Sequence, residues 1–472
     1  MPLFIIALFA ALGGFLFGYD VGVISGVLMT PSFVSVFQPM SALMQGTIVS
    51  MLIPGCILGS LLAGPLCERV GRKHSILLAA LLLVVGVGIQ AAAFDIRVLF
   101  AGRFVSGMSI GKLSVAGPLY LSEIAPSRIR GRVVSLQQGA VAIGIAVAFC
   151  VSYASNELVG DLAWRLPLGL QIIPAVILAI GTELLPQSPR WLLKLECDED
   201  AKHNLSSLRS VDQNSSQVRE ELADIKRSIL LERQTTTGAY LELFKAPMLK
   251  RTMLSLLIHA CQQLTGISIV LYYSPTLFIK AGVSSVHASL VAQGICALVN
   301  VVGFLPSLFV IDTWGRRPTL IAGALIMACA MLTVGLVQVA YPIPSTNAAY
   351  VAASGIYVFV AAFSCSWGPV AWIYPAEIFP LLLRSKALSL ATAINWLFNG
   401  LITLFGPILI QTLGFTIYFI LASFLFVMAV TVFFLFPETK GHSLENTHSI
   451  FYPSHSAIEN QATKRSPYNF SY

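Results

Sequence analysis

Long apolar stretches alternate with short polar connections over almost the whole chain. They can be drawn at residues 3–26, 43–66, 75–94, 98–121, 133–153, 166–186, 252–279, 286–311, 318–340, 350–375, 387–410 and 414–436. Each is close to the roughly 20 apolar residues that a helix needs to cross a hydrocarbon core. The pattern therefore predicts an all-α membrane protein of about twelve transmembrane helices.

Basic residues gather in every second connection. The connections at 30–42 and 341–349 carry almost none, whereas those after the second, fourth, eighth and tenth stretches hold Arg69, Arg72, Lys73, Arg128, Arg130, Arg132, Arg316, Arg317, Arg384 and Lys386. Because basic connections remain on the cytoplasmic side of a membrane, both termini are expected in the cytoplasm.

The composition excludes several other classes. Charged residues make up 11% of the chain and hydrophobic residues 56%, whereas a soluble domain has roughly 25% charged residues. The basic connections explain the net charge of +7, so no nucleic-acid partner is expected. The eight cysteines are scattered singly, without the spacing of a metal site or a disulfide framework. We therefore expect no cofactor and no bound metal.

A long polar segment, residues 194–250, separates two sets of apolar stretches that repeat each other. Short motifs recur about 250 residues apart, as in carriers that hold a substrate between two halves. The pairs are Gly71-Arg72-Lys73 with Gly315-Arg316-Arg317, Ser122-Glu123-Ile124 with Ala376-Glu377-Ile378, and Pro186-Gln187-Ser188-Pro189-Arg190 with Pro437-Glu438-Thr439-Lys440-Gly441. We expect an N-terminal six-helix bundle (1–190), a cytoplasmic helical linker (191–250), a C-terminal six-helix bundle (251–437) and a short cytoplasmic tail (438–472).

Taken in this order, the motifs resemble the sugar porter family of the major facilitator superfamily over residues 8–444. The resemblance also includes Gly18-Tyr19-Asp20, Gly102-Arg103, Gln262-Gln263-Leu264-Thr265-Gly266 and Pro375-Ala376-Glu377-Ile378-Phe379. Residues 136–138 and 366–372 look most like fungal monosaccharide transporters.

The resemblance implies the major facilitator fold, with two pseudo-symmetric six-helix bundles and an intracellular helical linker. It also implies secondary active transport of a monosaccharide by alternating access, with a proton as co-substrate. Such a carrier is expected in the plasma membrane, surrounded by the lipid bilayer and functional as a monomer.

A sugar presents hydroxyls that both donate and accept hydrogen bonds, together with weakly apolar ring faces, so carboxamides and indoles suit its site. By resemblance, the residues that contact the sugar are Gln138, Gln262, Gln263, Ser268, Asn300, Trp372, Asn395 and Trp396. Ser268 departs from the family, which usually has Asn there, so one contact is expected to be weaker or bridged by water. His259 shares a helix face with Gln262 and is expected mainly to pack. The alternative role for any single amide is helix packing.

Two charged residues lie inside apolar stretches, where a charge is costly and is usually paired or functional. They are Asp20 in the first stretch and Arg103 in the fourth. The resemblance implies that Asp20 takes up a proton and releases Arg103, which would couple proton movement to a conformational change. The alternative is a static buried ion pair between the two helices.

Further residues are expected to gate the transport path. By resemblance, Tyr272 and Tyr273 close the outer side. At the inner helix ends, charged residues are expected to form ion pairs between the halves when the carrier is open outward. These residues are Glu123, Arg130, Arg316, Glu377 and Arg384. The basic members also serve membrane topology. Gln187 replaces a usual Glu, so one of these pairs is expected to be missing.

Two other functions remain open from the sequence. One is a facilitative sugar or polyol uniporter with the same site, and the other is a sugar sensor that does not transport. An enzyme is not expected, because the apolar stretches contain no nucleophile–base signature, metal-ligand cluster or nucleotide loop.

Overall fold

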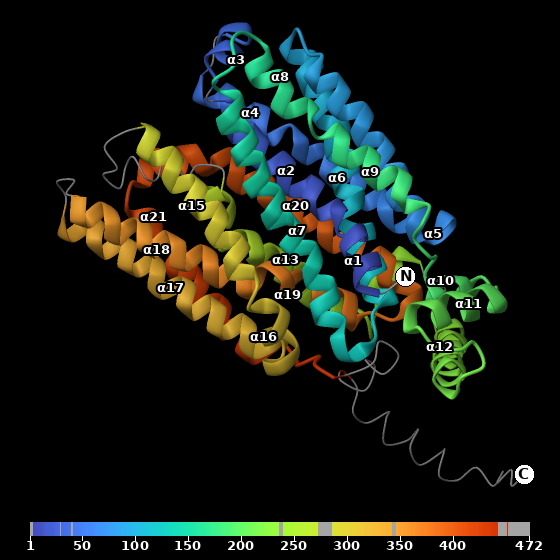
Figure 1. Ribbon diagram of the computed structural model, residues 1–472. Helices are drawn as coiled ribbons and strands as arrows, with labels where there is room; N and C mark the ends of the chain where they lie inside the picture. The colour runs from blue at the N-terminus through green and yellow to red at the C-terminus, as the bar shows by residue number, and fades with distance from the viewer. Residues whose placement is uncertain are drawn as a thin grey trace, which may run out of the picture.

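The computed structural model describes residues 3–28, 30–38, 41–235, 239–271, 286–341, 346–441 and 451, and this part of the chain is helical without any strand. Figure 1 shows two groups of long helices side by side, with a smaller group of helices at one end. We call the end that carries α10 (Pro189–Lys194), α11 (Asp198–Arg209) and α12 (Ser216–Thr235) the linker end. The N-terminus lies at this end as well.

The first group of helices precedes the linker. Its members are α1 (Leu3–Ala10), α2 (Leu12–Val27), α3 (Pro31–Val36), α4 (Ala42–Ser50), α5 (Leu52–Ala91), α6 (Ile96–Ile124), α7 (Arg130–Ser155), α8 (Leu162–Gly169) and α9 (Ile172–Thr182). We call this group the N-half.

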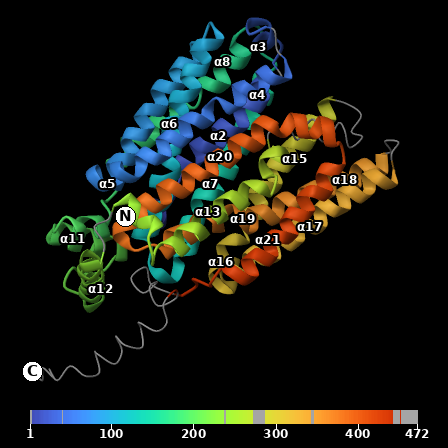
Figure 2. The ribbon, with the colours of Figure 1, turned by 180° about the vertical axis from the view of Figure 1, so that it is seen from behind.

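The second group, the C-half, follows the linker and the 3₁₀ turn η2 (Tyr240–Phe244). Its members are α13 (Leu249–Leu264), α15 (Val286–Phe304), α16 (Ser307–Trp314), α17 (Arg316–Ala340), α18 (Thr346–Cys365), α19 (Trp367–Ile378), α20 (Leu381–Leu413) and α21 (Thr416–Leu435). Figure 2 shows α20 running along the boundary between the two halves.

Ten helical segments in the described residues are long and apolar enough to cross a membrane, and the bent pair α15–α16 makes an eleventh. One of the ten, at residues 44–91, is 48 residues long, about twice what one crossing needs. It folds back at Gly71, where the backbone has φ 84° and ψ 169°. These segments therefore make twelve crossings, which confirms the predicted fold class.

The turn at Gly71 is tighter than the sequence pattern suggested. The apolar stretches end at residue 66 and restart at residue 75, whereas helical structure continues on both sides of Gly71. Only glycine readily adopts positive φ with ψ near 180°. Gly315, the matching residue of the C-half, has φ 106° and ψ 170° between α16 and α17.

The residues that face away from the bundle are apolar. Ile180 is 70% exposed and Phe434 is 75% exposed, as is expected for side chains that contact lipid. Inside the N-half, glycines bring backbones together, and a Cβ on Gly18 would lie 2.0 Å from the carbonyl oxygen of Val141. Close backbone approach at small residues is typical of helix packing in membranes.

Candidate functional site

A network of polar side chains joins α13 to α20 in the interior of the C-half. Gln263 Nε2 donates to Asn395 Oδ1 at 3.1 Å, and Asn395 Nδ2 donates to Gln262 Oε1 at 2.7 Å. Just beyond α13, Ser268 Oγ donates to Gln263 Oε1 at 2.8 Å. All four side chains are at most 7% exposed. The structure therefore brings four of the eight predicted sugar-contacting residues together.

Gln262 also fixes a break in the tenth crossing. Its Nε2 donates to the carbonyl oxygens of Trp367 at 3.0 Å and Gly368 at 3.1 Å. These residues follow Ser366, whose φ of −126° and ψ of −84° separate α18 from α19. Both hydrogens of this amide are thus used by the backbone, so Gln262 couples α13 to the broken helix in the conformation seen here.

His259 connects the network to Trp372. Its Nδ1 accepts from Asn395 Nδ2 at 3.1 Å, and its ring meets the Trp372 ring edge-on with centroids 5.0 Å apart. His259 is 1% exposed. It packs, as expected, and it also orients two of the predicted site residues.

The other predicted residues approach from different helices. Gln138 of α7 lies against Gly368, since a Cβ on that glycine would be 3.3 Å from Gln138 Nε2. Asn300 of α15 accepts a hydrogen bond from Ser364 at 2.5 Å. Trp396 of α20 contacts Phe17 of α2, with ring centroids 5.0 Å apart. Gln138 and Phe17 therefore bring the N-half to the same region.

The resemblance did not point to Asn399, which belongs to the same network. Its Nδ2 donates to Ser268 Oγ at 2.9 Å and to Gln263 Oε1 at 3.1 Å. A signal was present in the sequence, because Asn399 follows Asn395 by one helical turn and so shares its face of α20.

Asp20 and Arg103 face each other inside the N-half. Asp20 Oδ2 lies 3.6 Å from Arg103 Nη1, and both side chains are at most 1% exposed. Gln171 Nε2 approaches the other carboxylate oxygen at 3.5 Å, and Arg103 Nη2 donates to the carbonyl oxygen of Val49 at 3.2 Å. Asp20 Oδ2 has no hydrogen-bond partner among the described residues, so the pair is held mainly by charge.

Each half contains an arginine–glutamate ion pair at the linker end. In the N-half, Arg72 Nη2 lies 2.7 Å from Glu123 Oε1, and in the C-half Arg316 Nη2 lies 2.7 Å from Glu377 Oε1. A hydroxyl donates to the second oxygen of each carboxylate, from Ser188 and Thr439. Each of these glutamates binds an arginine of its own half, and the charge of Arg384 in the C-half also acts on Glu123. The expectation of ion pairs between the halves stays a prediction.

Two acidic residues that were not predicted also bridge the halves. Glu68 of the N-half binds Lys386 Nζ at 3.1 Å and accepts from Ser385 Oγ at 2.6 Å. Asp312 of the C-half accepts from the backbone N–H of Arg132 at 3.0 Å. Each acid lies three residues before the Gly-Arg motif of its own half, Glu68 before Gly71 and Asp312 before Gly315, a repeat that was visible in the sequence.

Gln187 and Glu438 hold matching positions but bind differently. Glu438 accepts from the backbone N–H groups of Arg316 at 2.9 Å and Arg317 at 3.0 Å. Gln187 Nε2 instead contacts His74 Nδ1 at 3.0 Å, and its Oε1 has no partner among the described residues. Gln187 therefore lacks the capping bonds that Glu438 makes, and the expected loss of an ion pair between the halves stays a prediction.

The remaining gating residues are placed as follows. Arg384 donates to the carbonyl oxygen of Phe379 at 3.0 Å, and Arg130 is 1% exposed at the start of α7. Tyr272 and Tyr273 lie outside the described residues.

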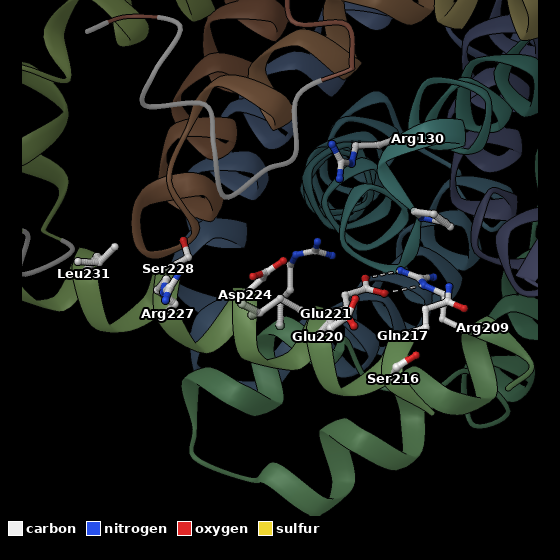
Figure 3. Close-up of a pocket in the computed structure, with 13 residues that line it drawn as sticks. Arg130, Arg209, Ser216, Gln217, Glu220, Glu221, Asp224, Arg227, Ser228 and Leu231 are labelled. Carbon is white, nitrogen blue, oxygen red and sulfur yellow. Dashed lines mark hydrogen bonds and ion pairs between the residues drawn. The ribbon is translucent and has the colours of Figure 1, made fainter. Parts of the chain in front are cut away.

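Figure 3 shows a cavity at the linker end, between α12 and the start of α7. Its volume is about 640 Å³, and its lining includes Arg130, Arg209, Glu221 and Asp224. Arg209 forms a two-point ion pair with Glu221 at 2.7 and 3.0 Å. This lining of opposite charges differs from the carboxamide and indole network, so the cavity belongs to the contact between the linker and the N-half.

Comparison with known proteins gives consistent results. The family model described as "Sugar (and other) transporter" matches residues 6–451. The high-affinity glucose transporter of Kluyveromyces lactis is 34% identical over 462 residues, which cover 94% of this chain and 84% of that protein.

Solved structures of one transporter match over nearly the whole chain. The proton:xylose symporter XylE bound to 6-bromo-6-deoxy-D-glucose has a TM-score of 0.85 at 29% identity, covering 95% of this chain and 99% of that one. The inward open conformation of XylE from E. coli has a TM-score of 0.71, at 29% identity and the same coverage. The lower score agrees with the ion pairs that close the linker end here. The protein therefore belongs to the sugar porter family of the major facilitator superfamily and is a sugar transporter of the membrane.

Proposed function

We propose that this protein carries a monosaccharide across the membrane by alternating access, as a proton symporter. The observation that carries the proposal is the buried network of Gln262, Gln263, Ser268, Asn395 and Asn399. The bonds of Gln263 with Asn395 and Asn399 can be exchanged for bonds to sugar hydroxyls at low cost, since a net hydrogen bond contributes only about 0.5–1.5 kcal/mol. Carboxamides carry both donor and acceptor groups, which suits a ligand whose hydroxyls also donate and accept.

The Asp20–Arg103 pair supports proton coupling. Its charges are 3.6 Å apart without a hydrogen bond between them, inside the N-half. Removing one partner from such a buried pair costs about 3–5 kcal/mol, because the other charge is left uncompensated. When Arg103 moves away, uptake of a proton by Asp20 removes that cost. The likeness to a proton:xylose symporter points in the same direction.

We further propose the organisation predicted from the sequence: an N-terminal bundle (1–190), a linker (191–250), a C-terminal bundle (251–437) and a tail (438–472). The basic residues at the linker end favour a cytoplasmic position for that end and for both termini. The plasma membrane and a monomeric state complete the proposal.

A panel of labelled monosaccharides, offered to a host that lacks its own sugar transporters, tests the transport function. We expect saturable uptake of at least one monosaccharide, and a protonophore should abolish accumulation against a gradient. Accumulation that ignores the protonophore would remove proton coupling from the proposal, and a lack of uptake for every sugar by correctly inserted protein would refute transport.

Asp20→Asn tests the coupling residue. We expect the variant to exchange labelled for unlabelled sugar across a vesicle membrane at a rate near that of the wild type, but to lose uphill accumulation. Asp161→Asn serves as the control, because Asp161 precedes α8 and pairs with Arg165 of that helix at a partly exposed site. Uphill accumulation by Asp20→Asn would rule out this role.

A further inference from the structure

Asn399 is held in one orientation by the network. It is 7% exposed on α20, and its Nδ2 donates to both Ser268 Oγ at 2.9 Å and Gln263 Oε1 at 3.1 Å. A carboxamide nitrogen carries two hydrogens, so both are used. The direction of the carbonyl oxygen Oδ1 is therefore fixed as well.

This oxygen is buried and has no hydrogen-bond partner among the described residues. An unsatisfied buried acceptor costs about 1–3 kcal/mol, and such groups in native proteins are nearly always bound by something. One turn earlier on α20, Trp396 Nε1 is a buried donor that also has no partner in the described part of the chain. Side chains three residues apart are neighbours on a helix, so α20 presents an acceptor and a donor next to the carboxamides.

The bonds of Ser268 explain why Asn399, and not Ser268, presents a free polar group to a ligand. Its hydroxyl hydrogen is donated to Gln263, and its oxygen accepts from Asn399. The short side chain therefore has no hydrogen left to donate to a ligand. Asn399 extends from α20 to the space beside Ser268, which a longer side chain at position 268 would fill.

We propose that Asn399 is a specificity-determining residue, whose Oδ1 accepts a hydrogen bond from one ring hydroxyl of the monosaccharide. The inference rests on the proposed function and extends it, because it makes one hydroxyl of the sugar a requirement. A site that binds a hydroxyl through a buried polar group rejects an analogue that lacks it. The deoxy sugar without this hydroxyl is expected to bind at least about tenfold more weakly, which corresponds to about 1.4 kcal/mol.

The test uses purified full-length protein in liposomes and measures how well each monodeoxy analogue of the transported sugar competes for uptake. The wild type should discriminate against one analogue in particular. In Asn399→Ala, the apparent affinity for the parent sugar should fall about tenfold, whereas the apparent affinity for the deoxy analogue should fall little. The ratio of the two apparent affinities should therefore approach one. If Asn399→Ala does not insert into the membrane, Asn399→Ser provides a second variant, because serine keeps a small polar group at this position.

Two further variants separate recognition from helix packing. Gln90→Ala removes a buried amide of α5 that bonds Ser106 at 2.7 Å, away from the network, and should leave the ratio unchanged. Ser268→Asn combined with Asn399→Ala should recover part of the discrimination, because the longer amide reaches into the vacated space.

The outcomes separate the two proposals. If the wild type transports no monosaccharide, the proposed function fails before the variants are compared. If the wild type transports a sugar and both Asn399 variants keep the wild-type ratio for every deoxy analogue, the inference about Asn399 is overturned.

Discussion

Glu438 and Gln187 occupy matching positions in the two halves but leave the neighbouring helix ends in different states. The Glu438 carboxylate caps the first N–H groups of α17, where a negative charge is also favoured by the helix dipole. Gln187 also lies close to its glycine, since a Cβ on Gly71 would be 2.9 Å from Gln187 Oε1 and one on Gly315 would be 2.5 Å from Glu438 Oε2, but Gln187 carries no charge. The two halves therefore differ in the strength of one contact at the linker end.

This difference predicts the effect of Gln187→Glu. A carboxylate beside Gly71 should accept from the N–H groups that follow it and stabilise the protein by about 0.3–1 kcal/mol. The expected result is a higher melting temperature of the purified protein in detergent. Glu438→Gln is the mirror change and should lower it. An unchanged or lower melting temperature for Gln187→Glu would contradict the capping interpretation.

The reach of sequence reasoning is visible in single residues of the site. Gln262, Gln263, Ser268 and Asn395 were predicted through resemblance, and the structure places them in one network. Asn399 and Glu68 were not, because their bonds depend on how α20 crosses α13 and α5. Hydropathy and spacing describe one helix at a time, whereas these bonds join helices that are far apart in the sequence.

At the scale of elements, the bundle is shaped by breaks inside its helices. Apolar length predicted the number of crossings, but not that the second and third form one helical segment around Gly71. A hydropathy pattern records which residues contact lipid and is insensitive to a reversal that needs only one residue. The break after Ser366 was also hidden, because α18 and α19 are both apolar.

Gly71→Ala tests the reversal. Its φ of 84° and ψ of 169° belong to a region that is essentially restricted to glycine, and occupying it with another residue costs about 1–3 kcal/mol. We expect a melting temperature several degrees below that of the wild type. Gly88→Ala is the matched control in the same helix, because a Cβ there meets nothing within 4 Å. Equal melting temperatures for Gly71→Ala and the wild type would refute the strain argument.

At the scale of the whole molecule, the halves are held together at the linker end by charged and polar bonds from several elements. Glu68 binds α20, and Asp312 binds the start of α7. The linker contributes through Glu232, whose carboxylate accepts from the backbone N–H groups of Leu381 at 3.0 Å and Leu382 at 2.9 Å. Opening of this end requires the bonds that cross from one half to the other to break, which makes their strength a determinant of the transport rate.

Glu68→Gln should therefore shift the balance of conformations. Loss of the carboxylate removes the ion pairs of Glu68 with Lys386 at 3.1 Å and with Lys194 at 3.6 Å, and partly exposed ion pairs contribute about 0.2–1 kcal/mol each. That loss falls on the state in which the linker end is closed. We expect a longer mean distance between spin labels on α11 and α16, measured by pulsed electron paramagnetic resonance.

Asp161→Asn, which removes an acid from a pair within one half, should leave the label distance unchanged. A distance distribution in Glu68→Gln that matches the wild type would show that this bridge does not control opening.

The reversal at Gly71 also bears on how the polypeptide enters the bilayer. Since the two crossings of residues 44–91 have no loop between them, they are suited to insert together as a preformed helical hairpin. Arg69, Arg72 and Lys73 at its tip would anchor the hairpin on one side of the membrane from the outset of biogenesis.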